Sequence, residues 1–179
     1  MMDASIGLVF DFDGVLVDTE PLHLAAFQAV LGRRGLPLDA REYYDRFVGF
    51  DDAGTFREYE RLHKITIDGI PKLMREKTDM FIRSLRHQTV FYDGSVEAVR
   101  RLGQAFPLAI ASGSRRDRIL TILEAAALTD AFVAIVSADD VPRSKPFPDS
   151  YVAAAAALGR APRRCVAIED SPGGLGAAP

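Results

Sequence analysis

The sequence predicts a doubly wound α/β fold with a helical insertion, because of the order in which its apolar runs and helical patterns follow one another. Four short apolar runs lie among helical patterns, and none of the runs alternates with polar residues. Strands of a parallel sheet have this composition because helices cover both faces of the sheet. A long helical stretch interrupts the alternation after the first run. A parallel sheet that carries one inserted helical unit explains both features.

Each of the four apolar runs is a candidate buried strand. They span residues 6–10, 108–111, 132–137 and 165–168. Helical patterns lie between or beside the later runs, over residues 95–106, 117–127 and 149–158. These patterns begin with Ser95, Asp117 and Asp149, which are good N-cap residues, so we expect a capped helix at each of the three positions.

The stretch 19–90 carries helical patterns but no convincing core strand. Glycines and prolines divide it into segments, and apolar residues recur at helical spacing within them, for example at Leu22, Ala25, Ala26, Ala29 and Val30. We therefore expect a core domain of residues 1–18 and 91–179 and a helical cap domain of residues 19–90. An insertion directly after the first strand is placed over the carboxyl ends of the sheet, where open α/β folds bind ligands. The cap is expected to act as a lid.

Length, composition and charge narrow the classes of function. The 179 residues include 22 basic and 25 acidic side chains, a net charge of −3, so the chain lacks the basic excess that nucleic acids or anionic membranes attract. A single cysteine cannot form an internal disulfide, and no apolar run approaches the roughly 18 residues that span a bilayer. Nothing resembling a secretion leader precedes the first strand. We expect a soluble cytoplasmic protein that acts on a small molecule, with no nucleic-acid or membrane partner.

Two acids follow the first predicted strand. Asp11 and Asp13 are separated by one residue, so in an extended chain their side chains leave the backbone on the same side. Two close carboxylates repel each other unless a cation or a proton compensates, and Mg²⁺ prefers such oxygen ligands together with a phosphate. Taken alone, the pair is also compatible with a solvated turn.

The other three predicted strands also end in polar groups. Residues 112–114 offer a hydroxyl and closely spaced backbone N–H groups that could hold a phosphate, although an ordinary serine and glycine turn has the same composition. Lys145 lies on a proline-stiffened loop and could neutralise a phosphoryl oxygen and a carboxylate, although a surface lysine is common there. Glu169 and Asp170 form a second acidic pair. Because the carboxyl ends of parallel strands converge, the four groups together predict one site.

With these residues in this order, the sequence resembles the haloacid dehalogenase-like hydrolase superfamily, and within it the branch of capped phosphatases and β-phosphoglucomutases. The resemblance covers nearly the whole chain and rests on the motifs at 11–19, 111–114, 144–146 and 169–171. It implies a Rossmann-like core with a helical cap, and phosphoryl transfer from a small phosphorylated metabolite, such as a sugar phosphate, with Mg²⁺ as cofactor.

The resemblance also implies roles for individual residues. Asp11 would attack phosphorus and form an aspartyl-phosphate, and Asp13 would protonate the leaving oxygen and then activate water. Ser112 and Lys145 would neutralise the charge of the phosphoryl group, as such a reaction requires. The substrate-binding candidates in the core are Gly14, Gly113 and Ser114. The metal candidates are Asp11, Asp13 through its backbone carbonyl, Asp170 directly, and Glu169 through water or as a support.

Asp13 favours phosphoryl transfer over dehalogenation, since the dehalogenases of the superfamily lack an acid two residues after the nucleophile. A phosphonatase would need a cap lysine that forms a Schiff base, and Lys64, Lys72 and Lys77 all lack a sequence context that demands it. A receiver-like signalling domain, the other aspartyl-phosphate fold, carries its acceptor on a later strand and lacks a helical cap.

Two cap residues resemble substrate-binding residues of β-phosphoglucomutases. They are His23 and Lys77, although a packing or hinge role for His23 and a solvated helix face for Lys77 are equally compatible with the sequence. Such mutases carry an arginine shortly after a cap glycine to grip a second phosphate, and here Phe50, Asp51 and Asp52 stand in its place. We therefore predict a phosphatase, with a phosphosugar mutase as the alternative.

The segment after the last acidic pair departs from the family pattern. Family members usually continue with a helix, a strand and a final helix, whereas residues 171–179 are rich in glycine and end in proline. We expect this segment not to form a stable helix of its own, since glycine costs about 1 kcal/mol per helical position and proline about 3 kcal/mol. With a C-terminal βα unit apparently missing, the edge of the fourth strand would be exposed. We therefore expect low stability, or a homo-oligomer that covers this edge. We also expect reduced activity and, at the extreme, an inactive phosphate-binding protein.

Overall fold

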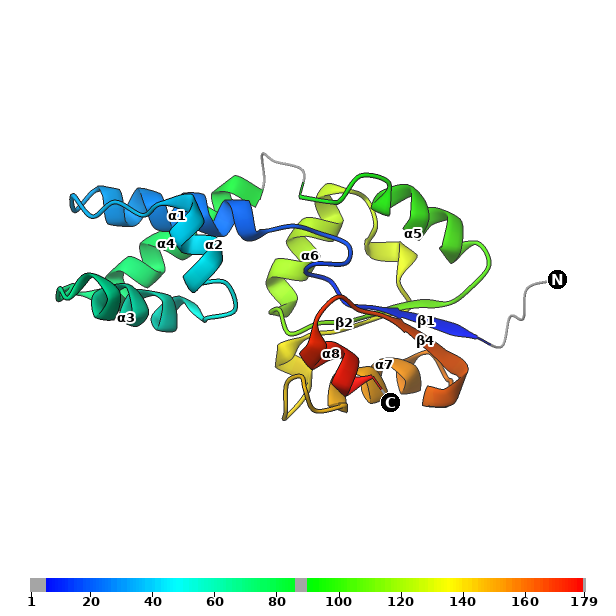
Figure 1. Cartoon of the computed structure of the whole chain (residues 1–179). Coiled ribbons are helices and arrows are strands. Elements are labelled where there is room, and N and C mark those ends of the chain that lie inside the picture. Colours follow the sequence, from blue (N-terminus) through cyan, green and yellow to red (C-terminus); the bar gives the residue numbers. More distant parts are fainter. Residues whose placement is uncertain (1–5, 86–89, 179) are drawn as a thin grey trace. The chain divides into compact units, whose positions relative to one another are not determined.

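A computed structural model of the chain describes residues 6–85 and 90–178, and the chain divides into two compact units (Figure 1). The core unit comprises residues 1–18 and 89–179, and the cap unit comprises residues 19–88. All four described strands belong to the core unit, and the described part of the cap unit is helical. In the described part of the chain, no helix is both long enough and apolar enough to cross a membrane.

The core unit contains a four-stranded parallel sheet. Its strands are β1 (Gly7–Phe10), β2 (Leu108–Ala111), β3 (Ala134–Val136) and β4 (Cys165–Ile168), in the spatial order β3-β2-β1-β4. The four predicted strands are confirmed, with the first and third shorter than expected. The strands β1 and β2 lie in the middle and are fully buried, as their unbroken apolar sequences require. The carboxyl ends of β1, β2 and β4 therefore lie at one edge of the sheet.

Helices cover both faces of the sheet. Helices α5 (Ser95–Gly103) and α6 (Arg116–Ala125) lie on one face, and α7 (Asp149–Ala157) and α8 (Pro172–Ala177) lie on the other (Figure 1). Three short 3₁₀ helices complete the unit, at Thr129–Ala131, Ala138–Asp140 and Pro162–Arg164. Small and branched side chains fill the space between the sheet and α7, among them Val9, Ala109, Ala111, Val136, Ala154 and Leu158. The predicted doubly wound α/β architecture is confirmed.

The N-caps predicted for the three core helices are wrong. The cap positions are Gly94, Arg115 and Pro148, and none of them makes a side-chain capping bond. Each expected cap residue lies inside its helix and has another partner. The Ser95 hydroxyl donates to the carbonyls of Leu16 and Tyr92, and the carboxylates of Asp117 and Asp149 pair with Arg115 and Arg143.

The segment after the last acidic pair forms a helix, α8, contrary to our expectation. The hydroxyl of Ser171 accepts a hydrogen bond of 3.0 Å from the backbone N–H of Gly174, and Pro172 occupies the first turn, where its missing N–H costs nothing. Gly174 and Ala177 are buried against the core unit. Capping and tertiary packing therefore stabilise a helix that its composition disfavours. The homo-oligomer expected at this edge stays a prediction.

The described part of the cap unit, residues 19–85, is a bundle of four helices. They are α1 (Glu20–Gly32), α2 (Ala40–Arg46), α3 (Asp52–His63) and α4 (Ile70–Leu85), and α4 packs against both α1 and α3. Their buried faces meet in an aromatic-rich core that includes Phe27, Tyr43, Phe47, Phe56 and Tyr59. The unit thus has a hydrophobic core of its own, as a separately folded insertion requires.

Candidate active site

The carboxyl edge of the sheet gathers the core residues that the sequence singled out. Asp11 directly follows β1, and its backbone N–H donates 2.9 Å to the carbonyl of Ile168 at the end of β4. Ser112 follows β2 and is joined in the same way to Val136 at the end of β3. Strand pairing therefore continues up to the functional residues, and it holds both side chains at the sheet edge in buried positions.

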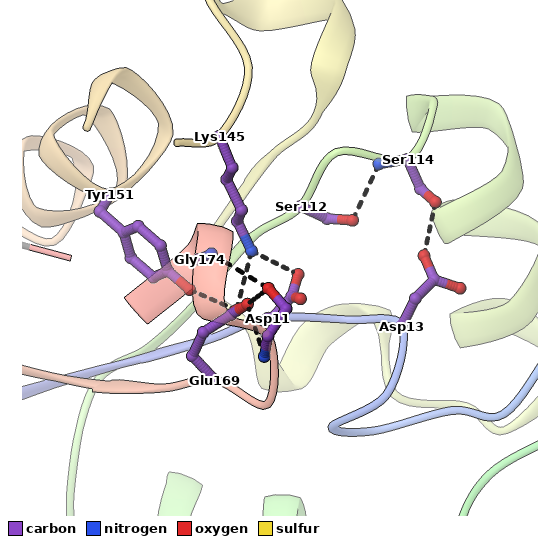
Figure 2. Close-up of polar contacts among 9 residues, drawn as sticks. Asp11, Asp13, Ser112, Ser114, Lys145, Tyr151, Glu169 and Gly174 are labelled. Atoms are coloured by element: carbon purple, nitrogen blue, oxygen red, sulfur yellow. Dashed lines mark hydrogen bonds and ion pairs between the residues drawn. The ribbon is translucent and has the colours of Figure 1, made fainter. Parts of the chain in front are cut away.

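Lys145 bridges two carboxylates at this edge. Its Nζ lies 2.8 Å from Oδ1 of Asp11 and 2.9 Å from Oε2 of Glu169 (Figure 2). The lysine comes from the loop before α7, and the peptide bond that joins it to Pro146 is cis. One ammonium thus neutralises part of the charge of two acids that come from different strands. Lys145 therefore lies beside Asp11, and the catalytic roles expected of both residues stay predictions.

Glu169 is held in place by four hydrogen bonds. Its side chain is fully buried, at 0% exposed. Oε2 accepts from Lys145 and from the Tyr151 hydroxyl at 2.8 Å, and Oε1 accepts from the hydroxyl and the backbone N–H of Ser171. A carboxylate has about four acceptor positions, so all of them are engaged. Glu169 is therefore fitted to support neighbouring groups rather than to bind a metal directly.

Two glycines let the backbone approach the acids closely. Gly14 has a φ of +82°, and a Cβ built there would overlap the carboxylate of Asp170. A Cβ at Gly174 would overlap Oε1 of Glu169. At Gly113, by contrast, a Cβ would meet nothing within 4 Å. The expected substrate contacts of Gly14 and Gly113 stay predictions, and the structure adds that Gly14 makes room for Asp170.

The acidic cluster is suited to a divalent cation. One oxygen each of Asp11, Glu169 and Asp170 lie within 4.8 Å of one another. Because the oxygens of Glu169 are already engaged, Asp11 and Asp170 are the members of this cluster that are able to bind a cation directly. Three carboxylates beside one ammonium leave an excess of negative charge in a partly buried site. Hard oxygen donors of this kind suit Mg²⁺, and a divalent cation would offset that excess. The carboxylate of Asp13 does not belong to this cluster, and the metal contact expected of its backbone carbonyl stays a prediction.

Burial and hydrogen bonding drive the pKa values of Asp11 and Glu169 apart. Burial raises the pKa of Asp11 to about 7, although Lys145 opposes this effect. Burial also acts to raise the pKa of Glu169, but hydrogen bonds from Ser171, Lys145 and Tyr151 outweigh it and hold that pKa at about 2. In the absence of a metal, a proton therefore resides on Asp11 rather than on Glu169. A cation at the cluster would favour the ionised Asp11 that a nucleophilic attack needs.

Asp13 is bound on a different side of the site. Its Oδ2 accepts 2.5 Å from the Ser114 hydroxyl, and its Oδ1 accepts 2.7 Å from Nη2 of Arg118. In Figure 2 the carboxylate of Asp13 leans toward Ser114 and away from the carboxylate of Asp11. The backbone N–H of Ser114 in turn donates 3.0 Å to the hydroxyl of Ser112. The turn 112–114 thus links the carboxylate of Asp13 to the hydroxyl of Ser112.

Sequence reasoning missed three residues of this site. They are Arg118, Tyr151 and Gly174. Arg118 and Tyr151 both lie in the first turn of a helix that follows a predicted site motif. Their position next to these motifs could have identified them as candidates. Gly174 was missed because a glycine in this segment was considered only for its low helix propensity, and not for the close approach that it allows.

The two cap candidates form a partly buried cluster inside the cap unit. The side chain of Lys77 is only 2% exposed, so the solvated helix face considered for it is wrong. Its Nζ lies 2.6 Å from Nδ1 of His23 and 2.6 Å from Oδ1 of Asp52. The ring of His23 stacks on Phe81 with a centroid distance of 4.1 Å. The contact of His23 and Lys77 with substrate stays a prediction.

Comparisons with known proteins agree with this geometry. The family model described as "Haloacid dehalogenase-like hydrolase" matches residues 8–179. Among curated relatives, the fructose-1-phosphate phosphatase YqaB of Escherichia coli is 32% identical over 180 residues, which cover 99% of this chain and 93% of the relative. The β-phosphoglucomutase of Bacillus subtilis is 30% identical over 183 residues, which cover 95% of this chain and 77% of the relative.

A solved structure of the same family is also similar to this chain. A HAD family hydrolase from Deinococcus radiodurans, crystallised with bound phosphate and sodium, is 34% identical, with a TM-score of 0.78. The match covers 98% of this chain and 77% of that protein.

Proposed function

The chain belongs to the haloacid dehalogenase-like hydrolases and is a phosphomonoester hydrolase, and we propose that it is a Mg²⁺-dependent phosphatase that acts through an aspartyl-phosphate on Asp11. The observation that carries this proposal is the position of Lys145, whose ammonium lies between Asp11 and Glu169 at 2.8 Å and 2.9 Å. A buried carboxylate with a cationic partner beside a cluster of metal-binding oxygens is what an anionic nucleophile needs to approach an anionic phosphate.

The reaction has two halves. An oxygen of Asp11 attacks phosphorus, so that a bond from Asp11 to phosphorus forms while the bond to the leaving oxygen breaks. Asp13 gives its proton to that leaving oxygen and releases it as an alcohol. Asp13 then takes a proton from a water molecule, which attacks the same phosphorus, frees inorganic phosphate and returns Asp11 to its starting form. Lys145 and the Ser112 hydroxyl bind the phosphoryl oxygens throughout.

Four groups of this chain would hold the cofactor. We assign direct contact to the carboxylates of Asp11 and Asp170 and to the backbone carbonyl of Asp13, with Glu169 as a support. When bound, Mg²⁺ supplies positive charge that offsets the charge of the phosphoryl group. Gly14 allows the loop after β1 to pack against Asp170, and this close approach supports the same assignment.

The substrate is proposed to be a small metabolite with a single phosphate, such as a sugar phosphate. The name of the E. coli relative, a fructose-1-phosphate phosphatase, supports this class. In the cap, Lys77 pairs with Asp52, and the carboxylate of Asp51 caps α3 by accepting from Gly54. A second phosphate therefore lacks an available cation at these positions. A phosphosugar mutase is the alternative, since one relative at 30% identity carries that name.

The test is phosphate release from sugar phosphates, phosphoglycolate, nucleotides and an aryl phosphate, each with Mg²⁺ or with EDTA. We expect release that needs Mg²⁺, is fastest with sugar monophosphates and falls at least about 1,000-fold in Asp11→Asn. Asp130→Asn is the matched control, because this exposed acid lies in the 3₁₀ helix that precedes β3, at the opposite edge of the sheet. A folded protein that releases no phosphate from any substrate would contradict the proposal and favour an inactive phosphate-binding protein.

A further inference from the structure

We propose that Arg118 is a positioning residue for Asp13 and that its guanidinium fixes the place from which Asp13 transfers protons. This inference rests on the proposed function. Nη2 of Arg118 lies 2.7 Å from Oδ1 of Asp13, and the Ser114 hydroxyl holds the other oxygen at 2.5 Å. Both oxygens of one carboxylate are thus held by side chains that come from the same segment, the turn after β2 and the first turn of α6.

The base of Arg118 is rigidly placed. Arg116, at the start of α6, donates from its backbone N–H to Asp139 at 2.9 Å, and its guanidinium donates to Asp140 and to the carbonyl of Ile135 at 2.8 Å and 2.7 Å. These contacts tie the beginning of α6 to β3 and to the 3₁₀ helix Ala138–Asp140 that follows it. The side chain of Arg118 therefore starts from a fixed point, as a residue must if it is to orient another group.

The electrostatics explain why a second cation is needed. Asp11, Glu169 and Asp170 already form a cluster of acids with Lys145 beside it. A free Asp13 carboxylate two residues after Asp11 would be drawn toward Lys145 or toward a bound cation. An ion pair with Arg118 gives Asp13 its own partner, and Figure 2 shows its carboxylate leaning toward Ser114, away from Asp11. Arg118 thus holds the carboxylate of Asp13 apart from Asp11 and Lys145.

The position of Asp13 has a direct consequence for rate. Proton transfer needs the two heavy atoms within about 2.6–3.2 Å of each other, and a misplacement of about 1 Å can cost about 100-fold in rate. Loss of Arg118 should therefore lower kcat while substrate binding is retained. A phosphate-gripping arginine would show the opposite pattern, a raised KM.

The experiment compares Arg118→Gln, Arg118→Lys and Arg115→Gln. Arg115 is the matched control because it lies three residues earlier, is 73% exposed and pairs with Asp117. We expect Arg118→Gln to lower kcat about 10- to 100-fold with KM within about threefold of wild type, Arg118→Lys to recover most of the loss, and Arg115→Gln to match wild type. Melting temperatures verify that all three variants fold.

The acidity of the leaving group distinguishes a positioning role of Arg118 from a merely structural one. An aryl phosphate with an acidic phenol as leaving group needs little protonation, whereas an alkyl phosphate needs it fully. The defect of Arg118→Gln should therefore shrink with the aryl substrate when formation of the phosphoenzyme is measured in single turnover. In an Asp13→Asn background, Arg118→Gln should add little, since the group that it positions is already gone.

Three results would overturn the inference. The first is an Arg118→Gln defect that is equal for alkyl and aryl substrates, and the second is a full additional loss in the Asp13→Asn background. The third is an Arg118→Gln variant that behaves like Arg115→Gln. In each case an active wild type that is inactivated by Asp11→Asn would leave the proposed function intact, whereas an inactive wild type would contradict the function itself.

Discussion

Gly174 packs directly against the carboxylate of Glu169, so closely that a methyl group at position 174 would overlap Oε1. The same carboxylate is fully buried and accepts hydrogen bonds from Lys145, Tyr151 and Ser171. The support of the acidic cluster thus depends on helix α8, in which a Cβ would overlap Glu169 at position 174 but would meet nothing within 4 Å at position 173.

Replacing Gly174 by alanine is expected to displace Glu169. The overlap should lower the free energy of unfolding by about 1–3 kcal/mol. It should also weaken Mg²⁺ binding, because a displaced Glu169 would no longer hold Lys145 beside the acidic cluster. Gly173→Ala is the matched control, since a Cβ at position 173 meets nothing within 4 Å and alanine favours the helix by about 1 kcal/mol. Urea unfolding and calorimetric titration with Mg²⁺ measure both effects. Equal behaviour of the two variants would show that the close approach has no consequence.

The Tyr151 hydroxyl is expected to contribute to stability through Glu169. Tyr151→Phe retains the ring, which lies 5.0 Å from the Lys145 ammonium, and removes only the 2.8 Å bond to the carboxylate. A buried hydrogen bond to a charged group contributes about 1.5–3 kcal/mol, so the free energy of unfolding should fall by that amount. Tyr92→Phe, at an exposed tyrosine, should change it by less than about 0.5 kcal/mol. An unchanged stability in Tyr151→Phe would mean that water replaces the hydroxyl without cost.

The raised pKa of Asp11 predicts a pH dependence of stability in the metal-free protein. The folded state holds the Asp11 proton up to a pKa of about 7, against an ordinary value of 3.8. The stabilisation is therefore complete below pH 3.8 and is lost as the pH rises through 7. The lowered pKa of Glu169 changes the stability only below about pH 4.5, so above that pH the change comes from Asp11. Since one pKa unit corresponds to about 1.4 kcal/mol, the loss amounts to a few kcal/mol.

Urea unfolding in EDTA between pH 5 and pH 8 tests this pH dependence. Wild type should lose stability as the pH rises, and Asp11→Asn should lose much less, because the titrating group is gone. At pH 8, saturating Mg²⁺ should raise the free energy of unfolding of wild type far more than that of Asp11→Asn. Parallel curves for wild type and Asp11→Asn in EDTA would contradict the assignment of this titration to Asp11.

The ion pair between Asp52 and Lys77 is expected to influence the choice of substrate. In Asp52→Asn the charge of Lys77 loses its carboxylate, so we expect the preference for fructose 1-phosphate over fructose 1,6-bisphosphate to fall about tenfold, a difference of about 1.4 kcal/mol. Asp51→Asn is the control, since asparagine caps a helix as well as aspartate does. The ratio of kcat/KM for the two substrates is the measurement. A folded Asp52→Asn with the wild-type ratio would exclude this ion pair from substrate selection.

The sheet and the core motifs were predictable from the sequence because their signals are local. An unbroken apolar run such as Leu108–Ala111 identifies a buried strand, and a parallel sheet then brings Asp11, Ser112 and Glu169 to one edge. The first and third strands are shorter than predicted, since apolar composition does not mark where pairing ends.

The remaining features depend on contacts between distant residues. Arg118 and Asp13 are 105 positions apart, and periodicity contains no information about such a pair. The burial of Lys77 follows from His23 and Asp52, which lie on other helices. Helix α8 forms although glycine disfavours it, because Ser171 caps it and the core unit buries Gly174 and Ala177. Tertiary packing overrides local propensity at each of these positions.

The central claim is that phosphate passes through Asp11, and trapping the phosphoenzyme tests it most directly. The enzyme is mixed with a labelled sugar monophosphate and Mg²⁺ and quenched in acid within milliseconds, and the labelled peptide is mapped. In wild type, we expect a label on the peptide that contains Asp11, and hydroxylamine should release this label, as it does from an acyl-phosphate. In Asp11→Asn, we expect no label. Rapid phosphate release with no labelled enzyme at any quench time, or a hydroxylamine-stable label on Ser112, would contradict the claim.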